Sequence, residues 1–401
     1  MSKWFLPACL RILKTVHSMN PAAGGVATAI DALTRAELAL GHTVEVACLD
    51  NPKSPWLNER PYPVVAFEPA LFRSYGWCPA FAGWLRANAK RFDVLTVEGL
   101  WQFHGTAARA AAQEAGLPYV VYPHGMLDPW FAKAYPRKHL KKNLYWKLTG
   151  HKVLRDARAV AFTTEEEMRL AQHAFEPWRA HCVISPLGVV EPEQDMKDRK
   201  NAWQKKFPSL SGKHCLLYLG RLDPKKGADL LLEAYASVYT KETRETRKAP
   251  VIVLAGPETN AEYSTRCRNL MERFRLRDNA DVLWTGMLDN AMKWAALENA
   301  DALVLPSHQE NFGYVVAEAL AAGTPVLISK QVNLWREVIA DGAGLAASDD
   351  LPGTRELLAA HAAWTPDDRA RFANAARQCF LRRFQIGAAA QRQIEVLEGK
   401  C

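Results

Sequence analysis

The sequence lacks any run of about 18 uncharged apolar residues, the length that a helix needs to cross a membrane. Its first apolar run, Leu10 to Val16, is short and is interrupted by Arg11 and Lys14. The residues before it are too few and too weakly apolar for a secretory signal. We therefore expect a cytoplasmic protein, with the inner face of the cell membrane as a further location.

The sequence also lacks a Cys-x-x-Cys pair, and its eight cysteines are scattered. Cys48, Cys182 and Cys215 lie between apolar neighbours in expected strands, which is typical of buried reduced thiols. No Asp-x-Asp pair follows a strand where a metal would meet a nucleotide, and no His/Cys spacing suits a metal site. We expect no metal and no cofactor.

Acidic residues are outnumbered, because 43 Asp and Glu stand against 51 Lys and Arg, a net charge of +8. This excess indicates an anionic partner. A nucleotide-bearing substrate, a phosphorylated acceptor and an acidic membrane surface all fit. We do not expect nucleic acid, because the sequence contains no RNA- or DNA-reading module.

Short apolar strands alternate with helices along the chain, which predicts parallel, doubly wound sheets of the α/β class. The 401 residues suit two domains of roughly 100–200 residues each. A polar stretch at 191–206, followed by Pro, Ser and Gly at 208–213, predicts the linker. We predict two Rossmann-like domains facing across a cleft: residues 1–190, with a C-terminal helix at 385–401 crossing back, and residues 191–384. Strands are expected at 10–16, 43–49, 64–67, 93–97, 118–122, 159–163 and 181–185, then at 214–219, 250–255, 281–284, 302–305 and 324–328.

A basic turn follows the first expected strand of the second half. Arg221 offers a planar fork of donors and Lys226 a mobile ammonium group. Together they suit a diphosphate, whose departure as an anion needs charge stabilisation. A solvated basic turn is the alternative.

Two carboxylates, Glu310 and Glu318, lie eight positions apart where a strand passes into a helix. At about 1.5 Å rise per residue they can reach opposite ends of one small ligand. The amides of Asn311, Phe312 and Gly313 lie between them at a helix start, which favours an anion. The combination suits a phosphorylated sugar, although glutamate is also simply favoured at a helix start.

Taken in order, these motifs resemble the retaining glycosyltransferases of family 4, which have the GT-B fold. The resemblance covers nearly the whole chain and is strongest from Leu217 to Ile328. It implies transfer of a sugar from a nucleoside-diphosphate sugar to an acceptor hydroxyl, without a metal. The motifs that carry it are Gly220-Arg221…Lys226-Gly227, Val253–Pro257, Thr285-Gly286-Met287, Pro306-Ser307, Glu310–Gly313, Glu318-Ala319 and Gly323–Val326.

The resemblance also implies roles for individual residues. Arg221 and Lys226 would grip the donor diphosphate, and Glu310 would face the donor sugar. Glu318 would bind the ribose hydroxyls. The remaining donor-binding positions would be the amides of Asn311, Phe312 and Gly313 at the sugar and phosphate, and Gly286 and Met287 at the base.

Two motifs of the first half extend the resemblance. Gly24 and Gly25 look like the glycine turn after the family's first strand, with a plain tight turn as the alternative. The resemblance implies that His124 contacts the donor sugar near the reacting carbon, and a loop histidine that caps backbone is the alternative. The run His-Gly-Met-Leu-Asp-Pro-Trp resembles a subgroup that builds bacterial exopolysaccharide, O-antigen or other surface glycans. Its Asp128 is a candidate for orienting the acceptor hydroxyl.

The segment Lys133–Arg158 holds the densest positive charge of the chain. Leu140, Leu144 and Leu148 recur every four residues within it, which predicts a basic amphipathic helix. Such a helix docks on anionic lipid heads, or it turns its leucines to the core and its lysines to solvent. Both interpretations stay open.

The predicted function is therefore a retaining hexosyltransfer to a glycan or lipid-linked acceptor of surface-polysaccharide synthesis. A sugar-nucleotide epimerase on the same fold and a nucleotide-sugar-binding protein without catalysis are the alternatives. GDP-linked and UDP-linked donors both fit.

Overall fold

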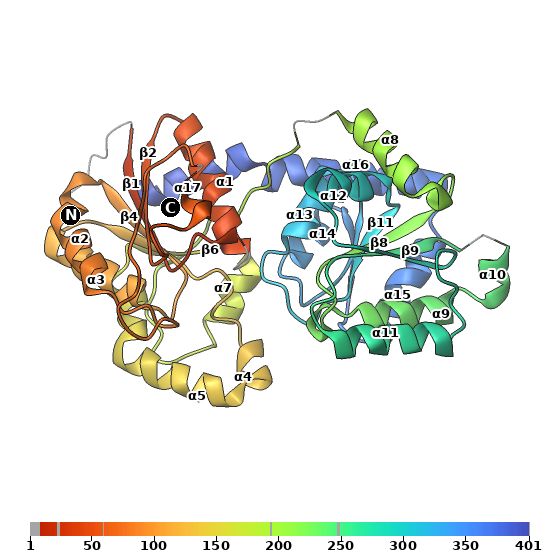
Figure 1. The fold of residues 1–401 in the computed structure, drawn as a ribbon, viewed down its shortest axis with the longest axis horizontal. Helices are drawn as coiled ribbons and strands as arrows, with labels where there is room; N and C mark the ends of the chain where they lie inside the picture. The colour runs from red at the N-terminus through yellow and green to blue at the C-terminus, as the bar shows by residue number, and fades with distance from the viewer. Residues whose placement is uncertain (1–8, 22–24, 59, 193–194, 247–248, 401) are drawn as a thin grey trace. The chain divides into compact units, whose positions relative to one another are not determined.

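The structure, a computed structural model, describes residues 9–21, 25–58, 60–192, 195–246 and 249–400. It divides into two compact units, one of Met1–Gly188 with Ile386–Cys401 and one of Val189–Gln385. Each unit has its own parallel sheet with helices on both faces (Figure 1). The predicted α/β class with two Rossmann-like domains is confirmed.

The first unit is built on seven parallel strands in the order β3-β2-β1-β4-β5-β6-β7. The order reverses between β1 and β4. In open parallel sheets, ligands bind at the carboxyl ends of the strands beside such a reversal. The strands are β1 (Arg11–Val16), β2 (Thr43–Cys48), β3 (Val64–Ala66), β4 (Val94–Glu98), β5 (Tyr119–Tyr122), β6 (Ala159–Phe162) and β7 (Cys182–Ile184).

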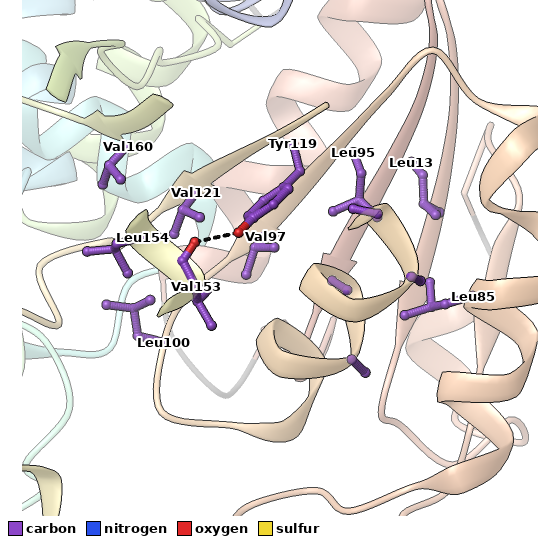
Figure 2. Close-up of a cluster of buried hydrophobic side chains, with 14 of the residues drawn as sticks. Leu13, Leu85, Leu95, Val97, Leu100, Tyr119, Val121, Val153, Leu154 and Val160 are labelled. Atoms are coloured by element: carbon purple, nitrogen blue, oxygen red, sulfur yellow. Dashed lines mark hydrogen bonds between the residues drawn. The ribbon is translucent and has the colours of Figure 1, made fainter. Parts of the chain in front are cut away.

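Helices cover both faces of this sheet, so its strands are apolar on both sides. One face packs Leu13, Leu95 and Val97 against α2 and α3, and Figure 2 shows these side chains with Leu85 of α2. The other face packs on α17 at the end of the chain through Ile394. The helices are α1 (Gly25–Ala39), α2 (Pro79–Asn88), α3 (Phe103–Ala115), α4 (Trp130–Ala134), α5 (Pro136–Tyr145), α6 (His151–Arg155), α7 (Glu165–Ala171) and α17 (Ile386–Glu398).

The second unit contains six parallel strands in the order β10-β9-β8-β11-β12-β13. Its order reverses between β8 and β11. The strands are β8 (Cys215–Leu219), β9 (Val251–Ala255), β10 (Val282–Gly286), β11 (Ala302–Leu305), β12 (Val326–Ser329) and β13 (Gly344–Ala347). The helices are α8 (Met196–Lys206), α9 (Ala228–Val238), α10 (Lys241–Glu245), α11 (Ala261–Arg273), α12 (Asn290–Asn299), α13 (Tyr314–Ala321), α14 (Trp335–Ala340), α15 (Leu351–Ala362) and α16 (Pro366–Arg383).

The stretch 191–206, predicted as a linker, is largely helix α8 of the second unit. Two residues of this charged helix pack it against the second unit. Trp203 is 4% exposed, and Arg199 forms a buried ion pair with Glu298 of α12. A helix can therefore dock through one aromatic ring and one compensated charge, without an apolar stripe.

The basic segment contradicts one of its two interpretations, that of a helix whose leucines face the core, and the lipid-docking interpretation stays a prediction. It is divided into α4, α5, a π-helical turn at Trp146–Gly150, and α6. Leu140, Leu144 and Leu148 are 71%, 62% and 60% exposed, so they do not face the core. None of the described helices is long and apolar enough to cross a membrane.

Candidate functional site

Two turns meet where the strand order of the second unit reverses. One follows β8 and carries Arg221 and Lys226, and the other follows β11 and carries Glu310. The amide of His308 donates to the carbonyl of Lys225 at 2.8 Å, which joins the two turns directly. The sheet thus brings together residues that the sequence separates by more than eighty positions.

Gly227 allows this close approach. Its φ is +71°, and a Cβ there would lie 2.4 Å from the carbonyl oxygen of Pro306. A side chain would therefore both strain the backbone and push the β8 turn away from the β11 turn. Glycine at this position is a condition for the geometry of the site.

Lys226 and Glu310 are in direct contact as an ion pair, with side chains 14% and 22% exposed. Burial, together with the charges of Lys225 and Arg221, lowers the pKa of Lys226 to about 8, although the charge of Asp223 acts in the opposite direction. Contact with the Glu310 carboxylate opposes this change. An anion bound here would meet a partly desolvated cation, and hydroxyl groups beside it would meet a carboxylate.

The turn at Glu310 is fixed from both ends. The amide of Glu310 donates to the carbonyl of Gln331 at 2.9 Å, and its carbonyl accepts from Asn333 at 3.1 Å. The side chain of Phe312 is buried, with ring contacts to Tyr314 and Phe384. Its predicted role concerns the amide alone, because the ring belongs to the core.

The amides of Asn311, Phe312 and Gly313 donate to no acceptor in the described part of the chain. Gly313, with φ +70°, is the N-cap of α13. Free amides at the start of this helix form an environment that favours an anion.

Glu318 forms an ion pair with Lys293 of α12, 2.5 Å between Nζ and Oε1. The side chains are 16% and 26% exposed, so the pair is accessible to a ligand. The sequence reasoning missed Lys293, although a single cation between Met292 and Trp294 on a largely apolar helix could have indicated it.

Gly286 ends β10, an edge strand of the same sheet, and Met287 follows it. Gly286 has φ +65°, its carbonyl accepts from the amide of Gly256 at 2.9 Å, and no atom lies within 4 Å of a Cβ placed on it. Met287 is 78% exposed. This exposed backbone lies at the carboxyl end of the sheet, on the same side as the β8 turn.

His124 follows β5 in the first unit, next to the end of β4. Its Nε2 lies 2.7 Å from Oε2 of Glu98, the last residue of β4, and both side chains are under 5% exposed. His124 has φ +51° and Gly125 φ +76°, while the amide of Gly125 donates to Oε1 of Glu167 at 2.6 Å. The uncommon backbone is therefore held by a buried carboxylate, as is typical of functional turns.

A second buried ion pair lies close to Glu98. Lys14 of β1 and Glu37 of α1 are 2.8 Å apart and almost inaccessible. Burial alone would raise the pKa of Glu98, but the hydrogen bond and charge of His124, with the charge of Lys14, hold it below its ordinary value. Burial raises the pKa of Glu37. Glu98 is thus an ionised carboxylate beneath His124.

Sequence reasoning missed Glu98, although an acid that ends an apolar strand was the available signal. Of the glycine turn, Gly24 lies outside the described residues and Gly25 begins α1. Oδ1 of Asp128 accepts from the amide of Trp130 at 2.8 Å, so this carboxylate shapes its own turn. Among the described residues, no cluster of three or more His, Cys, Asp or Glu side chains could hold a metal ion.

Two family models match the chain in succession. The one described as "Glycosyl transferase 4-like domain" matches residues 24–188, and the one described as "Glycosyl transferases group 1" matches residues 199–378. The first range lies in the first unit and the second range in the second unit.

Similar proteins include curated glycosyltransferases. A D-inositol 3-phosphate glycosyltransferase of Kineococcus radiotolerans is 26% identical over 339 residues, covering 81% of this chain and 70% of that one. A glycogen synthase of Mycobacterium tuberculosis is 36% identical over 168 residues, covering 41% of this chain and 37% of that one.

Among solved structures, Alr3699/HepE of Anabaena in complex with UDP and glucose has a TM-score of 0.73 at 17% identity. The match covers 97% of this chain and 99% of that chain. At this identity the likeness shows a shared two-domain fold.

Proposed function

We propose that this chain, a glycosyltransferase of the GT-B type, transfers a sugar from a nucleoside-diphosphate sugar to an acceptor hydroxyl with retention of anomeric configuration. The observation that carries the proposal is the contact between Lys226 and Glu310 where the strand order of the second unit reverses. An ammonium group suited to a departing diphosphate lies there beside a carboxylate suited to sugar hydroxyls, which supports the proposal.

In the proposed reaction, the bond between the anomeric carbon and the diphosphate oxygen breaks, and its electron pair leaves with the diphosphate. Arg221 and Lys226 stabilise that charge. The acceptor oxygen forms the new bond on the same face of the sugar, and the leaving phosphate takes the acceptor proton. No metal is required, since the two cations do the work of a Lewis acid on the leaving group.

The other residues bind and orient the donor. The amides of Asn311 to Gly313 hold phosphate and sugar, Glu318 accepts from ribose hydroxyls, and the backbone at Gly286 and Met287 meets the base. His124 binds the donor sugar, with its ring fixed by Glu98. Lys293 forms an ion pair with Glu318 and so holds that carboxylate in position as an acceptor.

For the acceptor, we propose a lipid-linked glycan of surface-polysaccharide synthesis, reached by a peripheral contact with the membrane. The support is α5 and the turn after it, where three exposed leucines stand among lysines and arginines. Apolar side chains that enter the interface and cations that meet anionic lipid heads each strengthen such binding.

The leaving-group role is tested with Arg221→Ala and Lys226→Ala at saturating donor. We expect a loss of about 10²–10³-fold in kcat for each, the effect of removing one charge-stabilising donor. Lys241→Ala is the matched control, because this lysine of the same unit is 70% exposed and pairs with Glu245 one helical turn away. Undiminished turnover of either site variant would disprove the role.

Retention and metal independence need separate measurements. The proton coupling constant at the anomeric carbon of the first-formed product shows whether the donor configuration is kept. Turnover in excess EDTA should equal turnover without it. Inverted product, or activity restored only by a divalent cation, would contradict the proposed mechanism.

A further inference from the structure

A cavity of about 280 Å³ opens in the first unit, within a few residues of His124. The loop after β5 contributes Met126 and Asp128 to its wall, and α4 and α5 contribute most of the rest. The size is near the lower end of the range of about 300–1,000 Å³ that small-molecule sites occupy. None of the residues to which we assigned donor roles lines it.

The chemistry of its wall is basic and aromatic. Lys138 lies over the ring of Tyr135 at 5.1 Å, and Lys142 lies over the rings of Trp101 and Phe131 at 4.5 and 5.4 Å. These contacts hold both ammonium groups at the cavity by cation–π attraction.

No ion pair joins either lysine to a carboxylate among the described residues. Burial lowers the pKa of Lys142, and the charge of Lys138 lowers it further. Two neighbouring cations, one of them half-buried, are electrostatically unfavourable together, and a bound anion would relieve that repulsion. Asp128 shares the wall, but its Oδ1 is engaged with the amide of Trp130.

Flat rings complete the wall. Phe175 is buried and stacks on His139 of α5 at 4.8 Å. Phe131 and Tyr135 present further ring surface. Aromatic faces pack against the C–H faces of a sugar ring, while cations at the rim hold a phosphate.

We propose that this cavity binds a phosphate-bearing sugar of the acceptor, with the phosphate between Lys138 and Lys142 and the sugar ring against Phe131 and Tyr135. The assignment of the cavity to the acceptor rests on the proposed function, since a transferase needs an acceptor site apart from its donor site. Free sugar phosphates and lipids that carry a sugar phosphate present the same chemistry.

The test is calorimetric titration of the full chain with glucose 1-phosphate, using the Arg221→Ala/Lys226→Ala variant as background so that the diphosphate turn does not bind the probe. Adding Lys138→Gln/Lys142→Gln should weaken binding at least tenfold. Adding Lys141→Gln/Lys147→Gln, an equal charge change on exposed neighbours in the same segment, should leave the Kd within about twofold, because exposed charges interact weakly through water. Equal loss in both variants, or equal affinity for uncharged glucose, would overturn the proposal.

The source of the phosphate is tested with vesicles that contain equal amounts of phosphatidylinositol or phosphatidylglycerol. Phosphatidylinositol carries a hydroxylated ring on its phosphate, as a lipid-linked sugar phosphate does, so a preference for it that Lys138→Gln/Lys142→Gln removes supports a lipid-borne ligand. Glucose 1-phosphate binding that depends on these lysines, without such a preference, supports a free one. If neither glucose 1-phosphate nor phosphatidylinositol shows binding that depends on these lysines, the cavity is not an acceptor site.

The failure of this inference is distinguishable from failure of the proposed function. In turnover assays with wild-type donor residues, the two lysine substitutions should raise the KM for acceptor and leave the KM for donor unchanged. If nucleotides stabilise the protein but the lysines affect no acceptor, only the cavity inference fails. If no nucleotide binds, the transferase proposal fails, whatever the cavity binds.

Discussion

Lys226 is held where its charge is costly, in a partly buried turn beside Lys225 and Arg221. The charge of Asp223 and the contact with the Glu310 carboxylate offset part of this cost. A diphosphate would supply a stronger counter-charge at the same point. The residue is therefore suited to meet a group whose negative charge increases during reaction.

The lowered pKa of Lys226 predicts a pH dependence. Below about 8 the side chain is protonated and can stabilise the leaving group, whereas the charge is lost as pH rises through that value. We expect kcat/KM to fall on the alkaline side of about 8. In Lys226→Arg this limb should move to higher pH, because arginine stays charged, and an unmoved limb would assign it to another group.

Glu98 is expected to act through His124. Glu98→Gln should lower kcat/KM roughly 10–100-fold, the loss typical when the partner that orients a functional histidine is removed. The double variant with His124→Asn should be no slower than His124→Asn alone, because the two residues act as one unit. Additive losses would show that Glu98 has a separate role, and thermal melting of each variant checks the fold.

At the residue scale, the sequence indicated single candidate residues but not the side-chain pairs that the fold forms between distant positions. Arg221, Lys226 and Glu310 were found because each follows an apolar strand in a recognisable turn. Glu98 and Lys293 were missed because their meaning depends on His124 and Glu318, which only the fold brings near. Whether these residues have the roles implied by the resemblance stays a prediction.

The elements that matter most are the two turns at the carboxyl ends of β8 and β11. The amide of His308 donates a hydrogen bond from one turn to the other. Gly227 allows this close approach because it has no Cβ. Parallel strands with short turns allow such approach, because adjacent carboxyl ends lie on the same edge of the sheet. The turns therefore form one surface, although they are distant in sequence.

Gly227→Ala tests this contact. Its Cβ would overlap the Pro306 carbonyl in addition to occupying a left-handed conformation. We expect a loss of unfolding free energy in the second unit of more than about 1–3 kcal/mol, the usual cost of the strained backbone alone. Gly212→Ala is the control, because Gly212 has φ +70° but open space around it.

Urea unfolding followed by tryptophan fluorescence measures both variants. Equal destabilisation would mean that the contact with Pro306 adds nothing to the backbone strain. Donor affinity should also fall in Gly227→Ala and stay unchanged in Gly212→Ala.

The strands and helices themselves were largely predictable, because buried parallel strands are short apolar runs between helical patterns. The exceptions have physical causes. β13 is made of Gly, Leu and Ala, which carry little strand preference, and α8 docks through Trp203 and an ion pair. The basic segment was read as one helix, but a π-helical turn divides it.

On the scale of the whole molecule, the net charge of +8 has a local counterpart in the first unit. In α5, Arg137 and three lysines lie among the exposed Leu140 and Leu144. Cations and apolar side chains on one exposed segment have the composition of a membrane contact.

Sedimentation with vesicles that contain anionic lipid tests this contact. Leu140→Ser/Leu144→Ser should lower binding about tenfold or more, because burying each leucine contributes roughly 1.5–3 kcal/mol. Leu71→Ser is the matched control, since Leu71 is 56% exposed elsewhere in the same unit. Binding should also weaken with salt, and equal effects of the site and control variants would contradict the membrane role.

Nucleotide binding by the second unit is the central requirement of the proposed function. The decisive measurement is the thermal transition of the wild type and of Arg221→Ala/Lys226→Ala with UDP, GDP and ADP at equal concentration. We expect one nucleoside diphosphate to raise the transition temperature of the wild type, by an amount that grows with its concentration, and to leave that of the variant unchanged. If no nucleotide raises the wild-type transition, or if the variant responds equally, the proposed donor site is wrong.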